Sequence, residues 1–298
     1  MQLASMRSKL IHWLIAIRPH TLTMTVAPVL VGSALAWNQT EKIHWLAVSI
    51  ALISGLLIQA ATNLYNDGAD HELGNDGDGR LGPTRCVASG IFTAHQVKRA
   101  AIILFSFSAV SGIYLVYIGG VPILILGVLS ILAGWGYSGG PRPIAYTPFG
   151  ELFVIVFFGL GAVGGTCWLA GGFIEAKTIM VGLSMGVFAS AVLLVNNFRD
   201  TECDTKAGRR TLSIVIGENS SKILYVLFMI LPFILLPAII NMTTHAAIWF
   251  TYAILPASVY QCWRFVVGPQ GKAFNNILKS TGQTQLAFGI LLSVGLVV

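Results

Sequence analysis

Residues 45–85 read WLAVSIALISGLLIQAATNLYNDGADHELGNDGDGRLGPTR and join an apolar run to a polar one. The apolar part, 45–65, is long enough to cross the roughly 30 Å of hydrocarbon in a bilayer as a helix. The polar part, 63–85, contains four aspartates, Asp67, Asp70, Asp76 and Asp78. The stretch therefore predicts a transmembrane helix with a cluster of carboxylates at its end.

Apolar runs of similar length recur along the whole chain. They cover approximately residues 20–38, 45–65, 97–118, 121–138, 152–172, 178–198, 221–241, 246–266 and 281–298. Only 10% of the side chains are charged, whereas soluble proteins carry roughly a quarter. The runs are continuous rather than alternating, which excludes a membrane β-barrel. We therefore predict an all-α fold, a polytopic membrane bundle of about nine transmembrane helices that forms a single domain over residues 1–298.

The lysine and arginine residues predict how this bundle is oriented. The N-terminal tail and the loops on its side of the bundle hold all of the 18 basic residues except Lys42 and Lys177. Cytoplasmic loops of membrane proteins carry the excess of lysine and arginine. We therefore expect a cytoplasmic N-terminus and an active-site cavity that opens on the cytoplasmic side. The net charge of +6 then reflects membrane orientation and not a nucleic-acid partner.

A second polar cluster, NNFRDTECDTKAGRR at residues 196–210, repeats the spacing of the first. Asn63-x3-Asp67 matches Asn196-x3-Asp200, and a further aspartate follows each pair. In a helix, spacings of three or four residues place side chains on one face. We expect two polar stripes that face each other across a cavity: Asn63, Asp67 and Asp70 on one helix, and Asn197, Asp200 and Asp204 on the other.

Clustered carboxylates near a membrane are costly and usually functional. Mg²⁺ is their natural partner because it prefers oxygen ligands and is commonly bound by one or two carboxylates together with substrate phosphates. Two facing clusters therefore predict a magnesium–diphosphate clamp. The predicted metal ligands are Asp67, Asp70, Asp76, Asp200 and Asp204. For Asp76, a solvated loop is the alternative interpretation.

Polar and basic residues near the carboxylates are predicted to bind the substrate, since arginine forms charge-assisted hydrogen bonds to phosphate. Arg18 lies at membrane depth before the first helix, where it could instead extend towards lipid headgroups. Arg142 lies between two prolines in a stiff loop, where an inert surface role is the alternative. The predicted substrate-binding residues are Asn63, Asn66, Asn197, Arg18, Arg80, Lys206, Arg209 and Arg142.

These motifs resemble the UbiA-type intramembrane aromatic prenyltransferases. The resemblance rests on Asn66-Asp67-x2-Asp70, on Asp200-x3-Asp204, on Arg18-Pro19 and on the Tyr137-Ser138 loop. IRPHTL, NLYNDGAD and LLVNNFRDTECDTKAGRRTL are similar to the branch of the family that uses 1,4-dihydroxy-2-naphthoate. The chain departs from the broad family pattern at Gly74, where a third aspartate is expected, and acidic residues return only at Asp76.

The resemblance implies a magnesium-dependent transfer of a polyprenyl group from polyprenyl diphosphate to 1,4-dihydroxy-2-naphthoate. Loss of carbon dioxide would then give demethylmenaquinol, in menaquinone biosynthesis. The implied catalytic residues are Asp67, Asp70, Asp200, Asp204 and Tyr137. Tyr137 and Arg142 would orient the aromatic acid. The implied location is the lipid bilayer of the bacterial cytoplasmic (inner) membrane, with no obligatory protein partner.

Two other functions remain open at the level of sequence. A related prenyltransferase that uses 4-hydroxybenzoate or a tetrapyrrole would keep both aspartate clusters but require a different loop over residues 137–151. A membrane transporter for magnesium or an organic anion would also place polar groups among apolar helices. The acidic residues gather at one membrane face rather than near the middle of the helices, which favours the enzyme.

Overall fold

The computed structural model of the chain describes residues 11–74, 81–82, 85–243, 245–268 and 271–298. Every regular element in these ranges is a helix, which agrees with the predicted all-α class. Two of the predicted site residues, Asp76 and Arg80, lie outside the described residues.

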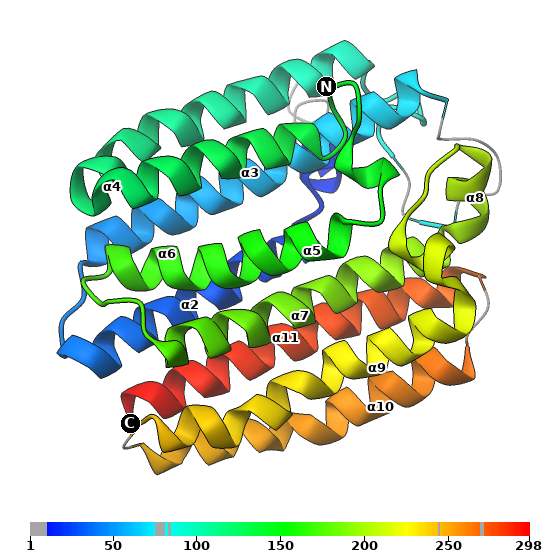
Figure 1. Cartoon of the computed structure of the whole chain (residues 1–298). Coiled ribbons are helices and arrows are strands. Elements are labelled where there is room, and N and C mark those ends of the chain that lie inside the picture. Colours follow the sequence, from blue (N-terminus) through cyan, green and yellow to red (C-terminus); the bar gives the residue numbers. More distant parts are fainter. Residues whose placement is uncertain (1–10, 75–80, 83–84, 244, 269–270) are drawn as a thin grey trace.

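The helices follow the apolar runs of the sequence and lie roughly side by side in one bundle (Figure 1). Helical residues 11–17 come first. The elements after them are α2 (Pro19–Thr40), α3 (Trp45–Glu72), α4 (Ala94–Gly136), η1 (Ile144–Tyr146), α5 (Gly150–Val154), η2 (Ile155–Gly161), α6 (Ala162–Leu169), α7 (Ala176–Arg199), α8 (Thr201–Lys206), α9 (Leu212–Asn241), η3 (Ala246–Ile254), α10 (Leu255–Val267), η4 (Gly271–Ala273) and α11 (Phe274–Val297).

Element α4 contains two of the predicted spans, 97–118 and 121–138. Gly120 has φ 69° and ψ −157°, a conformation that glycine adopts without a steric penalty and that breaks the helix. The two arms pack against each other. Phe105 of the first arm lies so close to Gly134 of the second that a Cβ on Gly134 would be 3.2 Å from its ring. Figure 1 shows them as a pair of antiparallel helices along one side of the bundle.

Helix α7 lies at the centre of the bundle and packs against α2, α5, η2, α9 and α11. Its small residues allow close approach, as is common between membrane helices. Gly159 of η2 lies so close to α7 that a Cβ there would lie 2.4 Å from the carbonyl oxygen of Gly182. On another face, Phe188 contacts the rings of Phe233 and Phe288 edge-on. α7 thereby holds the surrounding helices in place.

The chain is an integral membrane protein. Six of its described helices are long and apolar enough to cross a membrane: α2, α3, α4, the continuous segment Gly150–Leu169, α7 and α9. Large apolar side chains such as Phe107, Ile113 and Tyr117 cover the outer surface of α4, where a soluble protein would place polar ones. Since α4 contains two arms and the segments 246–267 and 274–297 are also helical, all nine predicted spans correspond to helices. That each of them crosses the bilayer stays a prediction.

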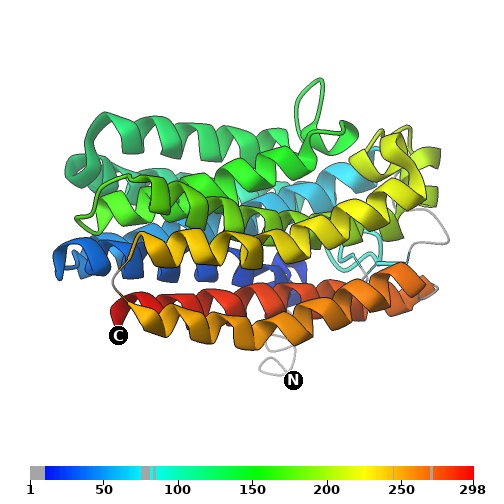
Figure 2. The same cartoon turned by 60° about the horizontal axis from the view of Figure 1, so that its bottom comes forward.

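Both polar motifs lie at the same end of the bundle (Figure 2). α3 and α7 run in the same direction, so the end of α3 and the α7–α8 junction meet there, where Arg209 binds Asp70. The opposite end holds Lys42, between α2 and α3, and Lys177, at the start of α7. The fold therefore brings two motifs that are far apart in the sequence to one cavity mouth.

Candidate active site

A cavity of about 700 Å³ lies among α2, α3, α4, α7, α11 and the Gly150–Leu169 segment. At the motif end its lining is polar and charged, and it includes Arg18, Asn63, Asn66, Asp70, Arg85, Asn197, Asp200, Asp204 and Arg209. Deeper in the bundle the lining becomes apolar, with Val29, Leu115, Ile123, Leu126, Phe153 and Phe157 among the side chains. The cavity thus combines a charged mouth with an apolar interior.

Asp70 joins the two motifs through arginines. Its carboxylate is almost fully buried and forms ion pairs with both Arg85 and Arg209. Arg209 also reaches Asp204, with 3.2 Å between Nη1 and Oδ1, and its guanidinium lies 5.1 Å from the centre of the Tyr146 ring. Burial lowers the pKa of Arg209, but the carboxylates of Asp70 and Asp204 raise it, and the net shift is upward. Arg209 therefore stays charged between the two clusters.

Asp200 is held by Arg199, its neighbour in the sequence. The guanidinium donates from Nε to Oδ1 over 2.8 Å and from Nη2 to Oδ2 over 2.5 Å, in a bidentate pair. Arg199 also donates to Asn196 over 2.9 Å and to Asn275 of α11 over 2.7 Å. This network fixes the end of α7 against α11 and places Asp200 at the cavity lining.

Asn66 connects three segments at the first motif. Its Nδ2 donates to the Ser138 hydroxyl over 2.6 Å, which ties α3 to the loop after α4. Its Oδ1 accepts from Arg18 over 3.4 Å and from Arg85 over 3.3 Å. Asn66 thus holds the guanidinium groups of Arg18 and Arg85 near Asp70 by accepting a hydrogen bond from each.

Arg18 has an unusual backbone that directs it towards this site. Its φ of 54° is in the left-handed region, which is uncommon for a residue with a side chain, and Pro19 starts α2 directly after it. Residues held in such conformations often occur at functional sites. The turn at Arg18 places its guanidinium within reach of Asn66 at the cavity mouth.

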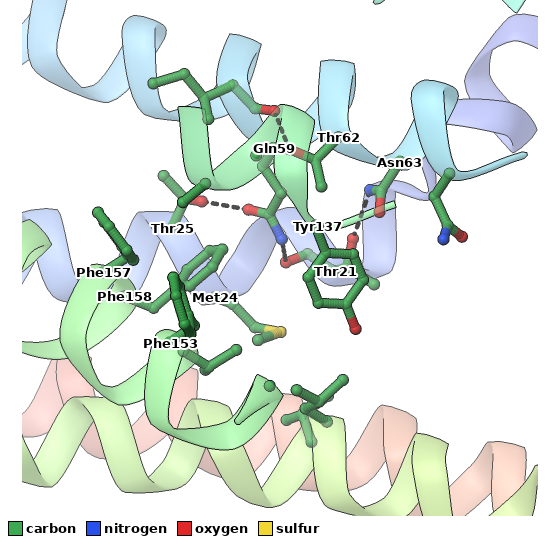
Figure 3. Close-up of a pocket in the computed structure, with 18 of the residues that line it drawn as sticks. Thr21, Met24, Thr25, Gln59, Thr62, Asn63, Tyr137, Phe153, Phe157 and Phe158 are labelled. Atoms are coloured by element: carbon green, nitrogen blue, oxygen red, sulfur yellow. Dashed lines mark hydrogen bonds between the residues drawn. The ribbon is translucent and has the colours of Figure 1, made fainter. Parts of the chain in front are cut away.

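Below the charged mouth, polar groups form a ladder between α2 and α3 (Figure 3). Asn63 donates to the Ile17 carbonyl over 2.9 Å and to the Thr21 hydroxyl over 3.1 Å. One turn deeper, Gln59 donates to the Thr21 carbonyl over 2.6 Å and accepts a hydrogen bond from Thr25. Such contacts hold neighbouring membrane helices together, and here they also line the cavity.

Aromatic side chains enter the cavity from two other elements. Figure 3 shows Phe153, Phe157 and Phe158 projecting from the Gly150–Leu169 segment and Tyr137 projecting from the end of α4. Burial raises the pKa of Tyr137, and the carboxyl group of Glu151 raises it further. The Tyr137 hydroxyl is therefore protonated at neutral pH and is available as a hydrogen-bond donor.

Some predicted site residues do not line this cavity. Asp67 is buried, accepts a hydrogen bond from the Cys86 main-chain N–H over 3.2 Å and lines a separate cavity of about 280 Å³. Lys206 is exposed and pairs with Glu202 of its own helix over 2.7 Å. Arg142 is exposed in the loop after α4. The structure thus brings together most, but not all, of the residues that the sequence predicted.

Other residues of the site were missed or undervalued by the sequence interpretation. Arg85 and Arg199 are buried partners of Asp70 and Asp200, although single arginines beside a membrane helix more often follow the positive-inside rule. Lys279 of α11 lines the cavity. Glu151 is buried against Asn197. In the sequence, the feature that could have identified Glu151 as a site residue is its position as an acidic residue directly before an apolar run.

The donor set of the cavity fits a magnesium ion that arrives with a diphosphate. Among the described residues, no three His, Cys, Asp or Glu side chains lie close enough together to hold a metal by themselves. Asp70, Asp200 and Asp204 nevertheless line one cavity mouth and offer hard oxygen ligands. Mg²⁺ typically binds one or two carboxylates and completes its coordination with water and substrate phosphates. The arrangement therefore suits a metal shared with a substrate.

The chain is similar to known membrane proteins over most of its length. The model of the UbiA prenyltransferase family matches residues 25–276. A 1,4-dihydroxy-2-naphthoate octaprenyltransferase from Haemophilus influenzae is 31% identical over 300 residues, which cover 97% of this chain and 97% of that protein. The Escherichia coli protein of the same name is 38% identical over 216 residues, 70% of each chain.

A solved structure shares the fold. A UbiA homolog from Archaeoglobus fulgidus, bound to GPP and Mg²⁺, superposes with a TM-score of 0.71 at 15% sequence identity. The match covers 96% of this chain and 99% of the archaeal chain. The helical bundle is therefore common to both proteins.

Proposed function

Because the chain belongs to the UbiA prenyltransferase family, we propose that it transfers a polyprenyl group from polyprenyl diphosphate to 1,4-dihydroxy-2-naphthoate. The reaction requires Mg²⁺, releases carbon dioxide and gives demethylmenaquinol. The bacterial relatives named for this acceptor support the substrate. The distribution of basic residues supports a location in the bacterial cytoplasmic membrane, with the N-terminus and the cavity mouth on the cytoplasmic side.

One observation carries this proposal: Arg209 binds Asp70 of the first motif and Asp204 of the second at the mouth of an apolar cavity. A shared guanidinium between two carboxylate clusters marks a place where charges of both signs are concentrated. A diphosphate and its magnesium ions bring the same combination of charges. The apolar interior beyond the mouth suits an isoprenoid tail.

Mg²⁺ would bind one or two of the carboxylates of Asp70, Asp200 and Asp204 together with phosphate oxygens of the substrate, with the Asn197 amide as a further oxygen donor. When bound, the metal neutralises the charge that develops on the leaving diphosphate. The assignment of Asp67 to the metal stays a prediction, since its carboxylate lines the smaller cavity. The assignment of Asp76 to the metal also stays a prediction, because Asp76 lies outside the described residues.

Arg18, Arg85 and Arg209 would bind the diphosphate. Without substrate, Arg85 and Arg209 form ion pairs with Asp70. When the substrate binds, these guanidinium groups exchange carboxylate oxygens for phosphate oxygens, and the carboxylates become available to the metal. The exchange avoids leaving any buried charge unpaired, which would cost several kcal/mol. The roles of Arg80 and Lys206 in diphosphate binding stay predictions.

The transfer then breaks the bond between C1 of the prenyl group and the diphosphate oxygen, and the electron pair leaves with the diphosphate. The ring carbon that carries the carboxylate forms a bond to C1. The bond from this carbon to the carboxyl group then breaks, carbon dioxide leaves, and the electron pair of that bond restores the aromatic ring. Phe153 and Phe157 line the cavity interior, where they would exclude water from the allylic cation and stabilise it through their aromatic rings. Tyr137 would orient the acceptor by donating a hydrogen bond. Arg142, which is exposed in the loop after α4, is proposed to bind the carboxylate of the acceptor.

The test is prenyl transfer by the purified protein with a labelled polyprenyl diphosphate, Mg²⁺ and a series of acceptors. We expect a lipid-soluble quinol and labelled carbon dioxide from carboxyl-labelled 1,4-dihydroxy-2-naphthoate. Chelation of the metal should abolish the transfer. Transfer to 4-hydroxybenzoate alone would assign the chain to the other acceptor class, and transfer to none of the acids would contradict the proposal.

A further inference from the structure

We propose that Glu151 is a positioning residue, which orients the Asn197 amide so that its oxygen faces the cation in the cavity. The inference rests on the proposed function, because it concerns the magnesium ion of that same site. It adds to the metal site a residue from outside both aspartate motifs. It also assigns Asn197 to the metal rather than to the diphosphate.

Glu151 lies in the first turn of α5, packs against α7 and has only 2% of its surface exposed. Two residues of α7 hold it: Ser190 donates to its main-chain carbonyl over 2.7 Å, and Asn197 donates to its side-chain Oε1 over 2.9 Å. Ser190 and Asn197 are two helical turns apart and therefore lie on the same face of α7. Main chain and side chain of Glu151 are thus both fixed against one helix.

The contact with Glu151 determines the orientation of the Asn197 amide. In the asparagine amide only Nδ2 can donate a hydrogen bond, so the contact with Glu151 Oε1 must be made by Nδ2 of Asn197. The other amide atom of Asn197, Oδ1, is then the one that faces the cavity. Oδ1 accepts no hydrogen bond from the described residues. A carbonyl oxygen attracts a cation and repels a phosphate oxygen. The exposed end of Asn197 therefore has the polarity of a metal ligand.

Asn63 in the first motif is oriented in the same way. Its Nδ2 donates to the Ile17 carbonyl, which can only accept, and to the Thr21 hydroxyl. Its Oδ1 likewise accepts no hydrogen bond from the described residues, and Asn63 lines the same cavity. Each motif thus contributes one asparagine whose NH₂ group is bound to the scaffold.

The cost of burying Glu151 also points to a function. Its Oε2 is buried and has no hydrogen-bond partner among the described residues. Acidic groups in membrane segments are expensive, and an unsatisfied buried polar atom needs an explanation. An acceptor group is needed here, because a glutamine at this position could donate to Asn197 Oδ1 and turn the amide around. Fixing the amide explains why an acid is present.

The experiment is titration of the purified protein with Mn²⁺, followed by electron paramagnetic resonance, in the presence of geranyl diphosphate and without an acceptor. We expect Glu151→Gln to weaken Mn²⁺ binding roughly 10- to 100-fold, the usual effect of losing a group that orients a metal ligand. Ser190→Ala is the matched control: it removes the other contact to Glu151, whose carbonyl keeps its hydrogen bond from Ile155. It should bind Mn²⁺ like the wild type.

A second variant separates orientation from damage to the fold. An aspartate at 197 presents an oxygen whichever way its side chain is turned, so Glu151→Gln combined with Asn197→Asp should regain the Mn²⁺ affinity. Unchanged Mn²⁺ binding by Glu151→Gln, or failure of Asn197→Asp to restore it, would overturn the proposal. Prenyl transfer by the wild-type protein is measured separately, so the proposed function stands or falls independently of Glu151.

Discussion

At the scale of single residues, the site depends on charges that are paired before any substrate arrives. Among the described residues, Asp70 pairs with Arg85 and Arg209, and Asp200 forms a bidentate pair with Arg199. Buried ion pairs of this kind add little stability relative to apolar packing, whereas removal of one partner is costly. In the proposed function, these pairs hold the carboxylates and the guanidinium groups together at the cavity mouth. When the substrate binds, the carboxylates can then bind the metal and the guanidinium groups can bind the diphosphate.

Arg209→Met tests this exchange. The substitution removes charge-assisted hydrogen bonds worth about 1.5–3 kcal/mol each, so we expect the KM for the polyprenyl diphosphate to rise roughly 10- to 100-fold. The KM for the aromatic acid should change far less. The matched control is Arg210→Met, because Arg210 is exposed next to it in the sequence. Equal effects of the two substitutions would show that general positive charge, and not the contact with Asp70 and Asp204, binds the diphosphate.

The Tyr137 hydroxyl gives a prediction about pH. Burial and the nearby Glu151 carboxyl raise its pKa above the ordinary tyrosine value of about 10. The neutral form is therefore present from about pH 6 to about pH 9, and the group donates a hydrogen bond rather than accepting a proton. Tyr137→Phe should lower kcat/KM roughly tenfold without changing the shape of its pH profile. If kcat/KM of the wild type falls at high or low pH and this fall is absent in the phenylalanine variant, Tyr137 titrates during catalysis.

Sequence reasoning found some of these residues and missed others for a physical reason. Asp70, Asp200 and Asp204 were recognisable because their helical spacing is unusual beside apolar runs. Arg199 was not recognised as a site residue, and Arg85 was considered for phosphate binding but not selected, since a basic residue at a cytoplasmic helix end looks the same whether or not it pairs with a buried acid. Only the fold shows which carboxylate lies within reach.

At the scale of elements, the contact between η2 and α7 sets one wall of the cavity. η2 is a π-helical turn inside the Gly150–Leu169 segment, and such turns are frequent at functional sites. It directs Phe157 and Phe158 into the cavity, while Gly159 on its other face packs against Gly182 and Gly186 of α7. The position of the aromatic wall therefore depends on small residues at this contact.

Gly159→Ala should disturb this wall. The added Cβ would lie 2.4 Å from the Gly182 carbonyl oxygen and 2.6 Å from the Gly186 Cα, so the backbones must separate. Overpacking of this kind costs about 1–3 kcal/mol, which should appear as a lower apparent unfolding temperature in detergent. Gly112→Ala is the control, because nothing lies within 4 Å of a Cβ there. Equal unfolding temperatures for both variants would contradict the close contact.

The sequence located the helices better than it located their ends. All nine apolar runs correspond to helical residues, because hydrophobicity directly reports burial in lipid. Polar residues then extend several helices beyond these runs: α3 continues to Glu72, α9 begins at Leu212 and α11 begins at Phe274. Helical hydrogen bonding does not stop at the edge of the hydrocarbon, so hydropathy alone underestimates helix length at the end where the site lies.

At the scale of the whole molecule, the bundle combines a charged mouth with an apolar interior in one cavity. The two motifs approach each other because α3 and α7 run in the same direction through the bundle and end together (Figure 1). The sequence predicted this meeting from the repeated spacing and from the common membrane side. The shape of the cavity and the separate position of Asp67 depend on packing between distant segments, which no local pattern encodes.

The most direct test of a metal site shared by both motifs is anomalous diffraction from crystals of the protein grown with Mn²⁺ and geranyl diphosphate. We predict Mn²⁺ peaks in the large cavity, bounded by Asp70 on one side and by Asp200 and Asp204 on the other, with the diphosphate between them and the arginines. Mn²⁺ found only beside Asp67 in the smaller cavity, or bound by the carboxylates of one motif alone, would contradict a site built from both motifs.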